Sequence, residues 1–339
     1  FSSVAIVWFG AHLISSGNLQ IGNMMAFLEY AMQVIISFLL LSMVFIMVPR
    51  AAVSVKRVGE VLDTLPSIVD PQSPQQLPHD ATGKIEFKDV TFTYPDADLP
   101  VLSSINFTAE PGQTTAFIGS TGSGKSTLIN LIPRFYDVSA GQILLDGVDI
   151  RQLKLEDLYD QIGYVPQKGV LFSGTIASNI KYGNAKASQK LVEKSAKIAQ
   201  AAEFVSELKN GYKNEIAQGG SNVSGGQRQR LSIARAIAVE PNVYIFDDSF
   251  SALDFKTDAK LRSALAKETK HKTVLIVGQR INTIMNADKI IVLDEGKIVG
   301  QGTHQELMKG CQVYQEIAAS QLSEDDLQKM SAMTAKGAA

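Results

Sequence analysis

Residues 119–126 read GSTGSGKS, which has the spacing G-x-x-x-x-G-K-[ST] of a phosphate-binding loop. Glycines let backbone N–H groups converge on the β- and γ-phosphates of a nucleotide, and the helix that starts there adds a favourable dipole. Lys125 would bring a positive charge to these phosphates, and the Ser126 hydroxyl would be a Mg²⁺ ligand. The residues predicted to bind the nucleotide are Gly119, Ser120, Thr121, Gly122, Ser123, Gly124, Lys125, Ser126 and Thr127.

The flanking segments favour this interpretation over a glycine turn that only begins a helix. Thr115–Ile118 is an apolar run that predicts a strand leading into the loop, and apolar residues 128, 129 and 131 predict a helix leaving it. A second apolar strand, Val243–Asp247, ends on an aspartate. Asp247 is therefore predicted to complete the magnesium site, holding the metal through a water molecule.

A second glycine-rich segment lies between these two strands. Residues 223–230 read VSGGQRQR and are followed by LSIARA at residues 231–236. A serine and two glycines that open a helix let Ser224 Oγ and successive N–H groups bind an anion. This segment resembles the signature loop of ATP-binding cassette (ABC) proteins, and the resemblance implies that Ser224, Gly225, Gly226 and Gln227 bind ATP.

Other elements of the ABC family follow in the same order. Tyr94 resembles the aromatic residue that stacks on adenine. Gln167, in the run YVPQ, resembles the residue that touches Mg²⁺ and faces the membrane domain. Residues 251–254 read SALD and resemble the D-loop, which makes Asp254 a nucleotide-site residue. The resemblance extends from about residue 84 to residue 320, and it implies that two cassettes pair head to tail around ATP and Mg²⁺.

Three positions depart from the family pattern. Asp248 stands where the family has the glutamate that polarises the attacking water, so its carboxylate is one methylene shorter. Gln279 stands where the family has a histidine at the γ-phosphate, and an amide cannot take up a positive charge. Gln218 aligns with an acidic residue in a loop that contacts the membrane domains. Asp248 and Gln279, the predicted catalytic residues, would therefore give a weak site that still binds ATP.

This pattern resembles the degenerate-site subunit of a heterodimeric bacterial exporter of the multidrug or lipid type. The intact signature of this chain would then complete the competent ATP site of a second half-transporter. A slow, symmetric homodimer is the alternative. The resemblance thus implies an ABC-type ATPase whose own site is impaired in hydrolysis.

The elements that must position these residues alternate between β-rich and helical segments. Strands are predicted at 84–92, 113–118, 141–145, 244–247, 273–277 and 289–293, with a helix starting at Lys125. This alternation predicts an α/β nucleotide-binding domain with a largely parallel core sheet. Residues 153–229 are mostly helical and strand-poor, which predicts an inserted helical subdomain.

Residues 1–50 have a different composition. Met24–Val48 holds one formal charge, Glu29, and as a helix of about 37 Å it could cross a bilayer of about 30 Å. Arg50, Lys56 and Arg57 follow, which puts that end on the cytoplasmic side. A buried core helix is the alternative. Glu29 would either contact a substrate in the membrane or lie hydrated near the outer interface.

The predicted organisation has four parts. Residues 1–50 are the last helices of an all-α transmembrane domain, residues 51–82 a connecting helix and linker, residues 83–320 the cassette, and residues 321–339 a polar tail. No charged segment precedes the first apolar run, so a signal peptide is not predicted. The first residue is Phe1, within an apolar segment, and we therefore expect the chain to be a piece of a longer one. The net charge of −2 does not indicate the positively charged surface of a nucleic-acid-binding protein. The single cysteine, Cys311, is predicted to be a structural thiol.

These parts together predict a subunit of a multi-pass exporter in the cell membrane, with its cassette in the cytoplasm. Its partners would be the lipid bilayer, a second half-transporter and an exported substrate whose chemistry the sequence does not specify. Fusion of cassette and membrane helices favours export over import in this family. The alternatives are an ATP-gated regulatory or structural cassette without cargo, and a small-molecule kinase, which would have no use for Ser224–Gln227.

Overall fold

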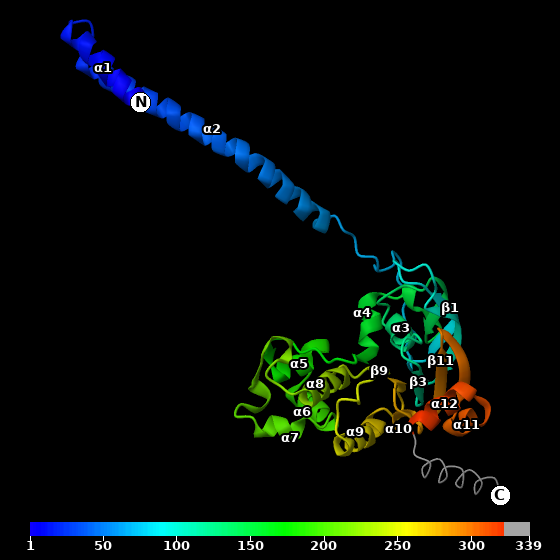
Figure 1. The fold of residues 1–339 in the computed structure, drawn as a ribbon. Coiled ribbons are helices and arrows are strands. Elements are labelled where there is room, and N and C mark those ends of the chain that lie inside the picture. The colour runs from blue at the N-terminus through cyan, green and yellow to red at the C-terminus, as the bar shows by residue number, and fades with distance from the viewer. Residues whose placement is uncertain (322–339) are drawn as a thin grey trace, which may run out of the picture. The chain divides into compact units, whose positions relative to one another are not determined.

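The computed structural model describes residues 1–321 of the 339-residue chain. The predicted polar tail lies almost entirely in residues 322–339, outside the described residues. Contacts divide the chain into two units, Phe1–Ser67 and a second unit that begins at Ile68. Each unit is described separately below, and Figure 1 shows the course of the chain through both.

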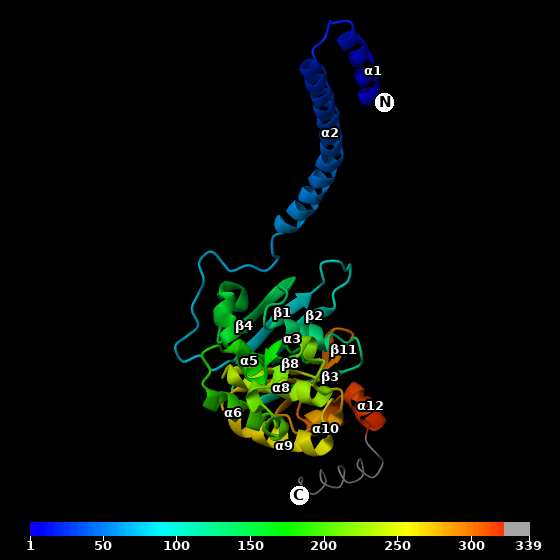
Figure 2. The ribbon, with the colours of Figure 1, turned by 90° about the vertical axis from the view of Figure 1, so that its left-hand side faces the viewer.

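The first unit consists of two helices, α1 (Ser2–Ser15) and α2 (Ile21–Leu62), which a short connection joins, as Figure 2 shows. Gly10 of α1 lies so close to Met24 of α2 that a β-carbon there would lie 2.7 Å from the Met24 sulfur. Helix α2 has a mean hydropathy of 2.5 in its most apolar 18-residue window, and the described structure buries none of that window. With 42 residues it is about 63 Å long, which exceeds the predicted span.

The core of the second unit is a six-stranded sheet. Its strands pair in parallel except for the edge strand β12, which is antiparallel to β11, so the predicted largely parallel core sheet is confirmed. Strands β9 and β10 are buried at every position, as expected for parallel strands covered on both faces. In order across the sheet, the strands are β12 (Lys297–Gly302), β11 (Lys289–Asp294), β3 (Thr114–Gly119), β10 (Thr273–Val277), β9 (Val243–Asp247) and β6 (Ile162–Val165).

Two predicted strands lie outside this core sheet. The predicted strands at 84–92 and 141–145 belong to a separate antiparallel sheet, because β1 pairs with β2 through a short connection and with β4 on its other side. The strands of this sheet, in order, are β2 (Leu102–Ala109), β1 (Ile85–Phe92), β4 (Ala140–Leu145) and β5 (Val148–Asp149).

The helical insertion begins later than predicted. Strand β6 falls inside the range 153–229, yet it pairs in parallel with β9 and completes the core sheet. Most of the segment beyond β6 is helical, and a two-stranded ribbon of β7 (Gly174–Thr175) and β8 (Glu215–Ile216) joins its two ends. The helices of this subdomain are α5 (Ile176–Ile180), α6 (Gln189–Ile198), α7 (Ala202–Glu207) and α8 (Gly225–Ala238), with short 3₁₀ turns at Lys181–Gly183, Gly211–Lys213 and Gln218–Gly220.

Three apolar clusters hold the second unit together. One joins the antiparallel sheet and α3 (Lys125–Leu131) to the core sheet. A second joins the helical subdomain and α9 (Phe255–Glu268) to β6, β9 and β10. The third packs α10 (Ile281–Ile284), α11 (His304–Gly310) and α12 (Gln312–Gln321) against β3 and β11. Cys311 is buried in this third cluster, as predicted for a structural thiol.

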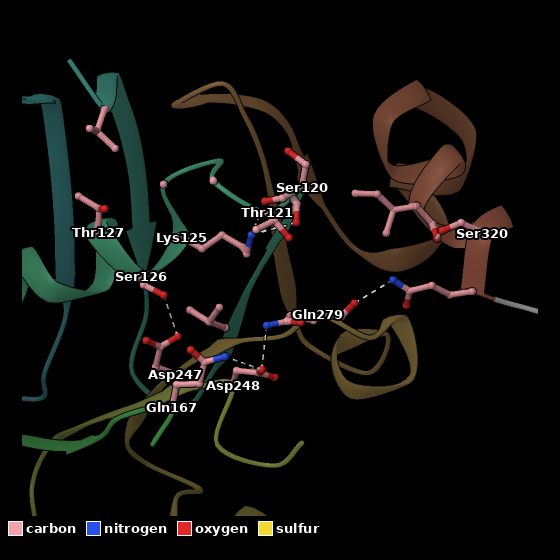
Figure 3. Close-up of a pocket in the computed structure, with 17 residues that line it drawn as sticks. Ser120, Thr121, Lys125, Ser126, Thr127, Gln167, Asp247, Asp248, Gln279 and Ser320 are labelled. Atoms are coloured by element: carbon pink, nitrogen blue, oxygen red, sulfur yellow. Dashed lines mark hydrogen bonds between the residues drawn. The ribbon is translucent and has the colours of Figure 1, made fainter. Parts of the chain in front are cut away.

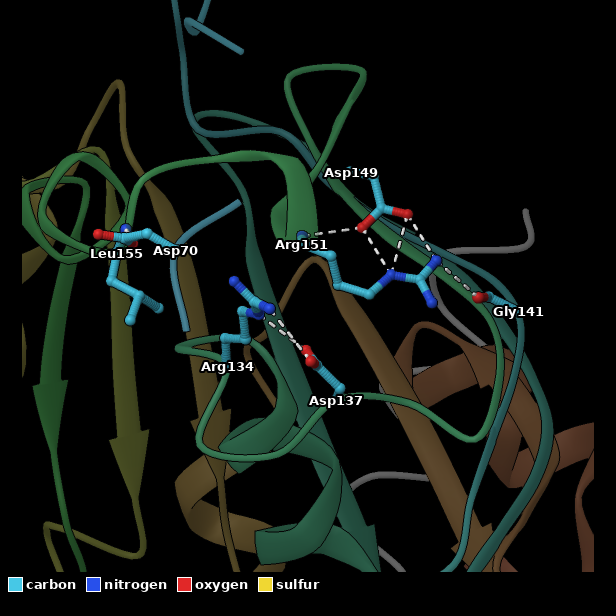
Figure 4. Close-up of polar contacts among 7 residues, drawn as sticks. All are labelled: Asp70, Arg134, Asp137, Gly141, Asp149, Arg151 and Leu155. Atoms are coloured by element: carbon cyan, nitrogen blue, oxygen red, sulfur yellow. Dashed lines mark hydrogen bonds and ion pairs between the residues drawn. The ribbon is translucent and has the colours of Figure 1, made fainter. Parts of the chain in front are cut away.

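The segment that leads into the cassette is fixed by polar contacts near α4 (Leu155–Asp160). Asp70 Oδ1 accepts a hydrogen bond from the backbone N–H of Leu155 at 2.7 Å. Both residues are labelled in Figure 4. The backbone N–H of Gln75 donates to the Gln152 carbonyl in the 3₁₀ turn Ile150–Gln152. Arg151 beside Asp149 and Arg134 beside Asp137 form ion pairs in the same view. The predicted linker therefore rests on the cassette from residue 70 onward.

Candidate nucleotide-binding site

Three parallel strands bring the candidate site together. Because the carboxyl ends of parallel strands meet at one edge of a sheet, the ends of β3, β9 and β10 lie side by side. Strand β3 leads into the glycine-rich loop, β9 ends at Asp247, and β10 is followed by Gly278 and Gln279. The topology therefore places these residues at the edge where open α/β sheets commonly bind ligands.

The glycine-rich loop has backbone angles that other residues rarely adopt. Gly122 and Gly124 have φ values of +85° and +95°. A β-carbon on Gly124 would also lie 2.7 Å from a methyl group of Leu102. Glycine at position 124 lets the chain enter α3 without a side chain over the start of the helix. Gly124 is the N-cap of α3, and no side chain caps that helix.

Lys125 crosses over this loop. Its Nζ donates to the carbonyl oxygens of Gly119 at 2.9 Å and Ser120 at 2.6 Å, and to Ser123 Oγ at 3.2 Å. Burial lowers the pKa of the Lys125 ammonium, while the carboxylates of Asp247 and Asp248 oppose that shift. The lysine is therefore held at the loop with two acidic groups close by.

Ser126 and Asp247 form the oxygen-rich part of the site. Ser126 Oγ donates to Asp247 Oδ1 at 3.2 Å, and Asp247 is only 6% exposed. Burial raises the pKa of Asp247, the Ser126 hydrogen bond lowers it, and Asp248 adds to the increase. Within residues 1–321, no three His, Cys, Asp or Glu side chains gather closely enough to hold a metal ion. Hydroxyl and carboxylate oxygens suit Mg²⁺, which commonly takes one or two protein ligands together with phosphate oxygens.

These groups open into a cavity of about 560 Å³, shown in Figure 3. Its walls come from the glycine-rich loop, the ends of β9 and β10, the Gln167 loop and the end of α12. The lining residues are Val101, Gly119, Ser120, Thr121, Gly122, Gly124, Lys125, Ser126, Thr127, Gln167, Asp247, Asp248, Val277, Gln279, Ile317, Ser320 and Gln321.

Asp248 is held by two amide side chains on one oxygen. Its Oδ2 accepts from Gln279 Nε2 at 2.9 Å and from Gln167 Nε2 at 3.2 Å (Figure 3). Its φ of +44° is strained for a non-glycine residue, and its N–H donates to the Val277 carbonyl. Burial raises the pKa of Asp248, and the hydrogen bond from Gln167 is the largest opposing cause. Two of the three residues expected to depart from the family pattern, Asp248 and Gln279, are thus direct hydrogen-bond partners.

Tyr94 lies beside the loop but outside the lining of the cavity. Its hydroxyl is 3.0 Å from Thr127 Oγ1. Its ring packs edge-on against Phe92 and Tyr136, with ring centroids 4.8 Å and 5.2 Å away. The aromatic side chain is therefore fixed in orientation next to the start of α3.

The signature segment also lies outside the cavity lining. Ser224 is the N-cap of α8, where its Oγ accepts from the Gln227 N–H and its own N–H donates to Gln227 Oε1. Gly225 and Gly226 form the first turn behind this cap. Asp254 caps α9 by accepting from the Thr257 N–H at 3.0 Å. Gln218, the third departure, lies in a 3₁₀ turn close before α8.

The end of α12 was not anticipated from the sequence. Ile317, Ser320 and Gln321 line the cavity, and Gln321 bonds the backbone on both sides of Arg280. No local motif marks these residues. Only their packing beside β3 and β11 brings them to the site.

Comparison with known proteins begins with a family model described as "ABC transporter", which matches residues 102–251. An uncharacterized ABC transporter ATP-binding protein of Mycobacterium tuberculosis is 47% identical over 323 residues, which are 94% of this chain and 55% of that protein. An ATP-dependent lipid A-core flippase of Syntrophus aciditrophicus is 38% identical over 321 residues, 95% of this chain and 53% of that protein.

Among solved structures, a bacterial Atm1-family ABC exporter with ATP bound matches with a TM-score of 0.81 and 32% sequence identity. The match covers 95% of this chain and 56% of that one. The chain therefore spans about half the length of the relatives that it matches. The fold is that of an ABC nucleotide-binding domain preceded by a helical part of the transmembrane type.

Proposed function

Because this chain contains an ABC transporter ATP-binding domain, we propose that it binds Mg·ATP in the cavity at the start of α3. The observation that carries the proposal is the convergence of Lys125, Ser126 and Asp247 on one cavity beside an uncapped helix start. Free backbone N–H groups at such a helix start favour a phosphate.

Each side chain of the site would have a separate role in binding. Lys125 would exchange its loop carbonyl partners for phosphate oxygens, and Ser126 with Asp247 would orient a magnesium ion. Tyr94 would present its ring to adenine, in the orientation fixed by Phe92 and Tyr136. Bound Mg²⁺ would supply neutralisation of charge on the phosphate oxygens.

Calorimetric titration of the chain with ATP, with and without Mg²⁺, tests this proposal. Wild type should bind ATP more tightly when Mg²⁺ is present, and Ser126→Ala should remove most of that gain. Ser206→Ala is a matched control, because Ser206 only donates to a backbone carbonyl in α7. Equal affinity of wild type with and without Mg²⁺ would remove Ser126 and Asp247 from a metal site.

We also propose that this site hydrolyses ATP slowly. The Asp248 carboxylate is shorter than the glutamate of the family pattern, and one of its oxygens already accepts two amide donors. A general base must reach the proton that it removes, so a carboxylate drawn back by one methylene and held by Gln167 and Gln279 is poorly placed. Gln279 can donate a hydrogen bond but cannot carry a positive charge.

The exposed signature segment supports the proposal of a partner cassette. Ser224 and Gly225 are exposed, and they lie outside the cavity of their own chain. Phe255, next to Asp254 at the start of α9, is 89% exposed. A large apolar side chain so exposed beside two polar helix starts suits burial against a second protein surface. We propose a second half-transporter, as in a heterodimer, whose ATP the Ser224 segment would contact.

The first unit supports a role in a membrane. Helix α2 exposes an apolar surface along its length, including Phe38 at 67% and Phe45 at 73%, and such a surface requires lipid or other helices around it. We propose that α1 and α2 belong to the membrane domain of an exporter. The basic residues Arg50, Lys56 and Arg57 would lie on the cytoplasmic side with the cassette.

A further inference from the structure

Gln321, the last residue of α12, bonds both ends of a short backbone segment with its side-chain amide. Its Nε2 donates to the Gln279 carbonyl at 2.8 Å, a contact drawn as a dashed line in Figure 3. Its Oε1 accepts from the N–H of Ile281 at 2.9 Å, which is the first residue of α10. One amide therefore uses a donor and an acceptor to clamp the loop that carries Gln279.

Helix α12 is itself firmly anchored. Tyr314 and Ala318 are fully buried in the cluster that joins α10, α11 and α12 to the sheet. The Tyr314 hydroxyl lies 2.7 Å from His304 Nδ1 at the start of α11. Because these contacts fix the helix, Gln321 is presented from a rigid element rather than from a loose end.

Gln279 connects the hydrogen bonds of Gln321 to the residues of the cavity. The amide of Gln279 has two N–H donors, and one of them goes to Asp248 Oδ2 at 2.9 Å. Gln279, Ser320 and Gln321 all line the cavity that also holds Lys125. The second N–H of Gln279 is then available to a phosphate oxygen in that cavity.

We propose that Gln321 is a positioning residue that holds Gln279 toward Asp248, and that the site thereby distinguishes a nucleoside triphosphate from a diphosphate. This inference rests on the proposed function. Lys125 is held at the carbonyls of the glycine-rich loop, and Asp248 and Gln279 line the same cavity at the ends of β9 and β10. The family resemblance puts the third phosphate group of a nucleotide at the position of Gln279, and a diphosphate lacks that group.

The test compares the affinities of the full chain for Mg·AMPPNP, a triphosphate analogue that resists hydrolysis, and for Mg·ADP. We expect Gln321→Ala to weaken AMPPNP binding about three- to tenfold, the effect of losing one or two hydrogen bonds, and to change ADP binding less than about twofold. Gln321→Glu should act in the same direction, because a carboxylate can accept from Ile281 but cannot donate to the Gln279 carbonyl.

Gln315→Ala is the matched control, since Gln315 lies on the same helix, its side-chain amide donates to the Met308 carbonyl, and it is not among the residues that line the cavity. It should leave both affinities unchanged. The second readout is the double variant with Gln279→Ala. If Gln321 acts through Gln279, adding Gln321→Ala to Gln279→Ala should have almost no further effect on AMPPNP binding.

Equal weakening of AMPPNP and ADP by Gln321→Ala, or full additivity with Gln279→Ala, would show that Gln321 only supports the fold and would overturn the inference. Failure of wild type to bind either nucleotide would overturn the proposed function and this inference with it. Thermal unfolding of each variant identifies a loss that comes from misfolding, and in that case Gln321→Glu decides the outcome.

Discussion

Helices α3 and α8 both begin at glycine-rich segments, but they differ in whether a side chain caps their first backbone N–H groups. Helix α3 begins at Gly124 with no side-chain cap, and it opens into the cavity lined by Lys125. Helix α8 begins at Ser224, where Ser224 and Gln227 cap each other reciprocally, and it lies outside that cavity. Uncapped N–H groups beside a lysine form an anion site within the chain. A capped, exposed start leaves fewer N–H groups for an anion, and the proposed function assigns this start to a nucleotide held by a second cassette.

If the proposed partner cassette exists, substitutions in this one chain should act on two different nucleotides. Changes at α3 should affect ATP bound by this chain, and changes at α8 should affect ATP bound by a partner. The predictions that follow separate the two helix starts, and they are ordered from the largest expected effect to the smallest.

The largest effect is expected at α8. Gly225→Asp should abolish most ATPase activity and transport of a complex with its partner reconstituted in lipid. The added carboxylate would face the phosphate of the competent site in a dehydrated interface, where like charges repel strongly. Ser224→Ala should act in the same direction by removing a hydroxyl donor.

Two comparisons sharpen this prediction. Gly310→Asp is the control, because a β-carbon at Gly310 meets nothing within 4 Å and the residue ends α11, outside both helix starts. Asp248→Ala should cost the complex much less if, as proposed, the site of this chain contributes little turnover. If Asp248→Ala lowers the ATPase activity of the complex as much as Ser224→Ala does, the two sites are equivalent. The proposal of an asymmetric heterodimer would then be wrong, and a symmetric dimer would be favoured.

At α3, Lys125→Ala should weaken ATP binding to this chain at least about tenfold, or about 1.4 kcal/mol. The substitution removes the cation that the loop holds at the cavity, while the Tyr94 ring keeps its packing. Calorimetry with the isolated chain gives the affinity, and Lys154→Ala, an exposed lysine paired with Glu156, is the control. Unchanged affinity would exclude Lys125 from the site and remove the contrast between α3 and α8.

A smaller effect is expected when the glutamate and histidine of the family pattern are placed at positions 248 and 279. If the proposed site hydrolyses ATP slowly, the double variant Asp248→Glu with Gln279→His should raise the ATPase rate of the chain several-fold, because it would restore the longer carboxylate and the ionisable ring of the family pattern. Each single variant should give less than the pair, since the two side chains are hydrogen-bonded to each other. A wild-type chain that already hydrolyses ATP quickly and loses this activity in Asp248→Ala would contradict the weak-site proposal.

The glycine-rich loop at the start of α3 was predictable from the sequence, because residues that are adjacent in the chain form it. Eight consecutive residues encode the loop, and the uninterrupted apolar runs of β9 and β10 identify the strands that end beside it. Strands β2, β6 and β12 were missed. Polar residues interrupt β2, β6 has only four residues, and β12 contains two glycines, so none shows a clear period.

Contacts distant in sequence were beyond prediction. Gln321 reaches Gln279 across 42 positions, and nothing in residues 312–321 distinguishes a glutamine that clamps a loop from one that faces solvent. The hydrogen bond between Asp248 and Gln279 was hidden for the same reason, although both residues had been singled out individually. Motifs identified the chemical groups, and tertiary packing decided which of them act together.

The smallest predicted effect is on how the free energy of unfolding depends on pH. This dependence should have opposite signs at Asp248, near α3, and at Asp254, near α8. Burial raises the pKa of Asp248 in the folded chain, against opposing contributions from Gln167, Ser251, Arg280 and Lys125. The folded state then holds a proton that the unfolded state releases. The free energy of unfolding therefore falls as pH rises from the ordinary aspartate range, about 3.9, through the folded pKa. Asp248→Asn should remove this loss and be more stable than wild type at neutral pH.

Asp254 should behave in the reverse way. Its hydrogen bonds with Thr257 lower its pKa in the folded chain, so its contribution is present above the ordinary aspartate range and is lost as pH falls toward the folded pKa. Asp254→Asn, which keeps a good N-cap residue, should remove that dependence without gaining stability at neutral pH. Urea unfolding of both variants and wild type between about pH 4 and pH 7 gives the two slopes. Slopes of the same sign would mean that burial does not dominate at Asp248, and that its carboxylate is held in its charged form by the amides around it.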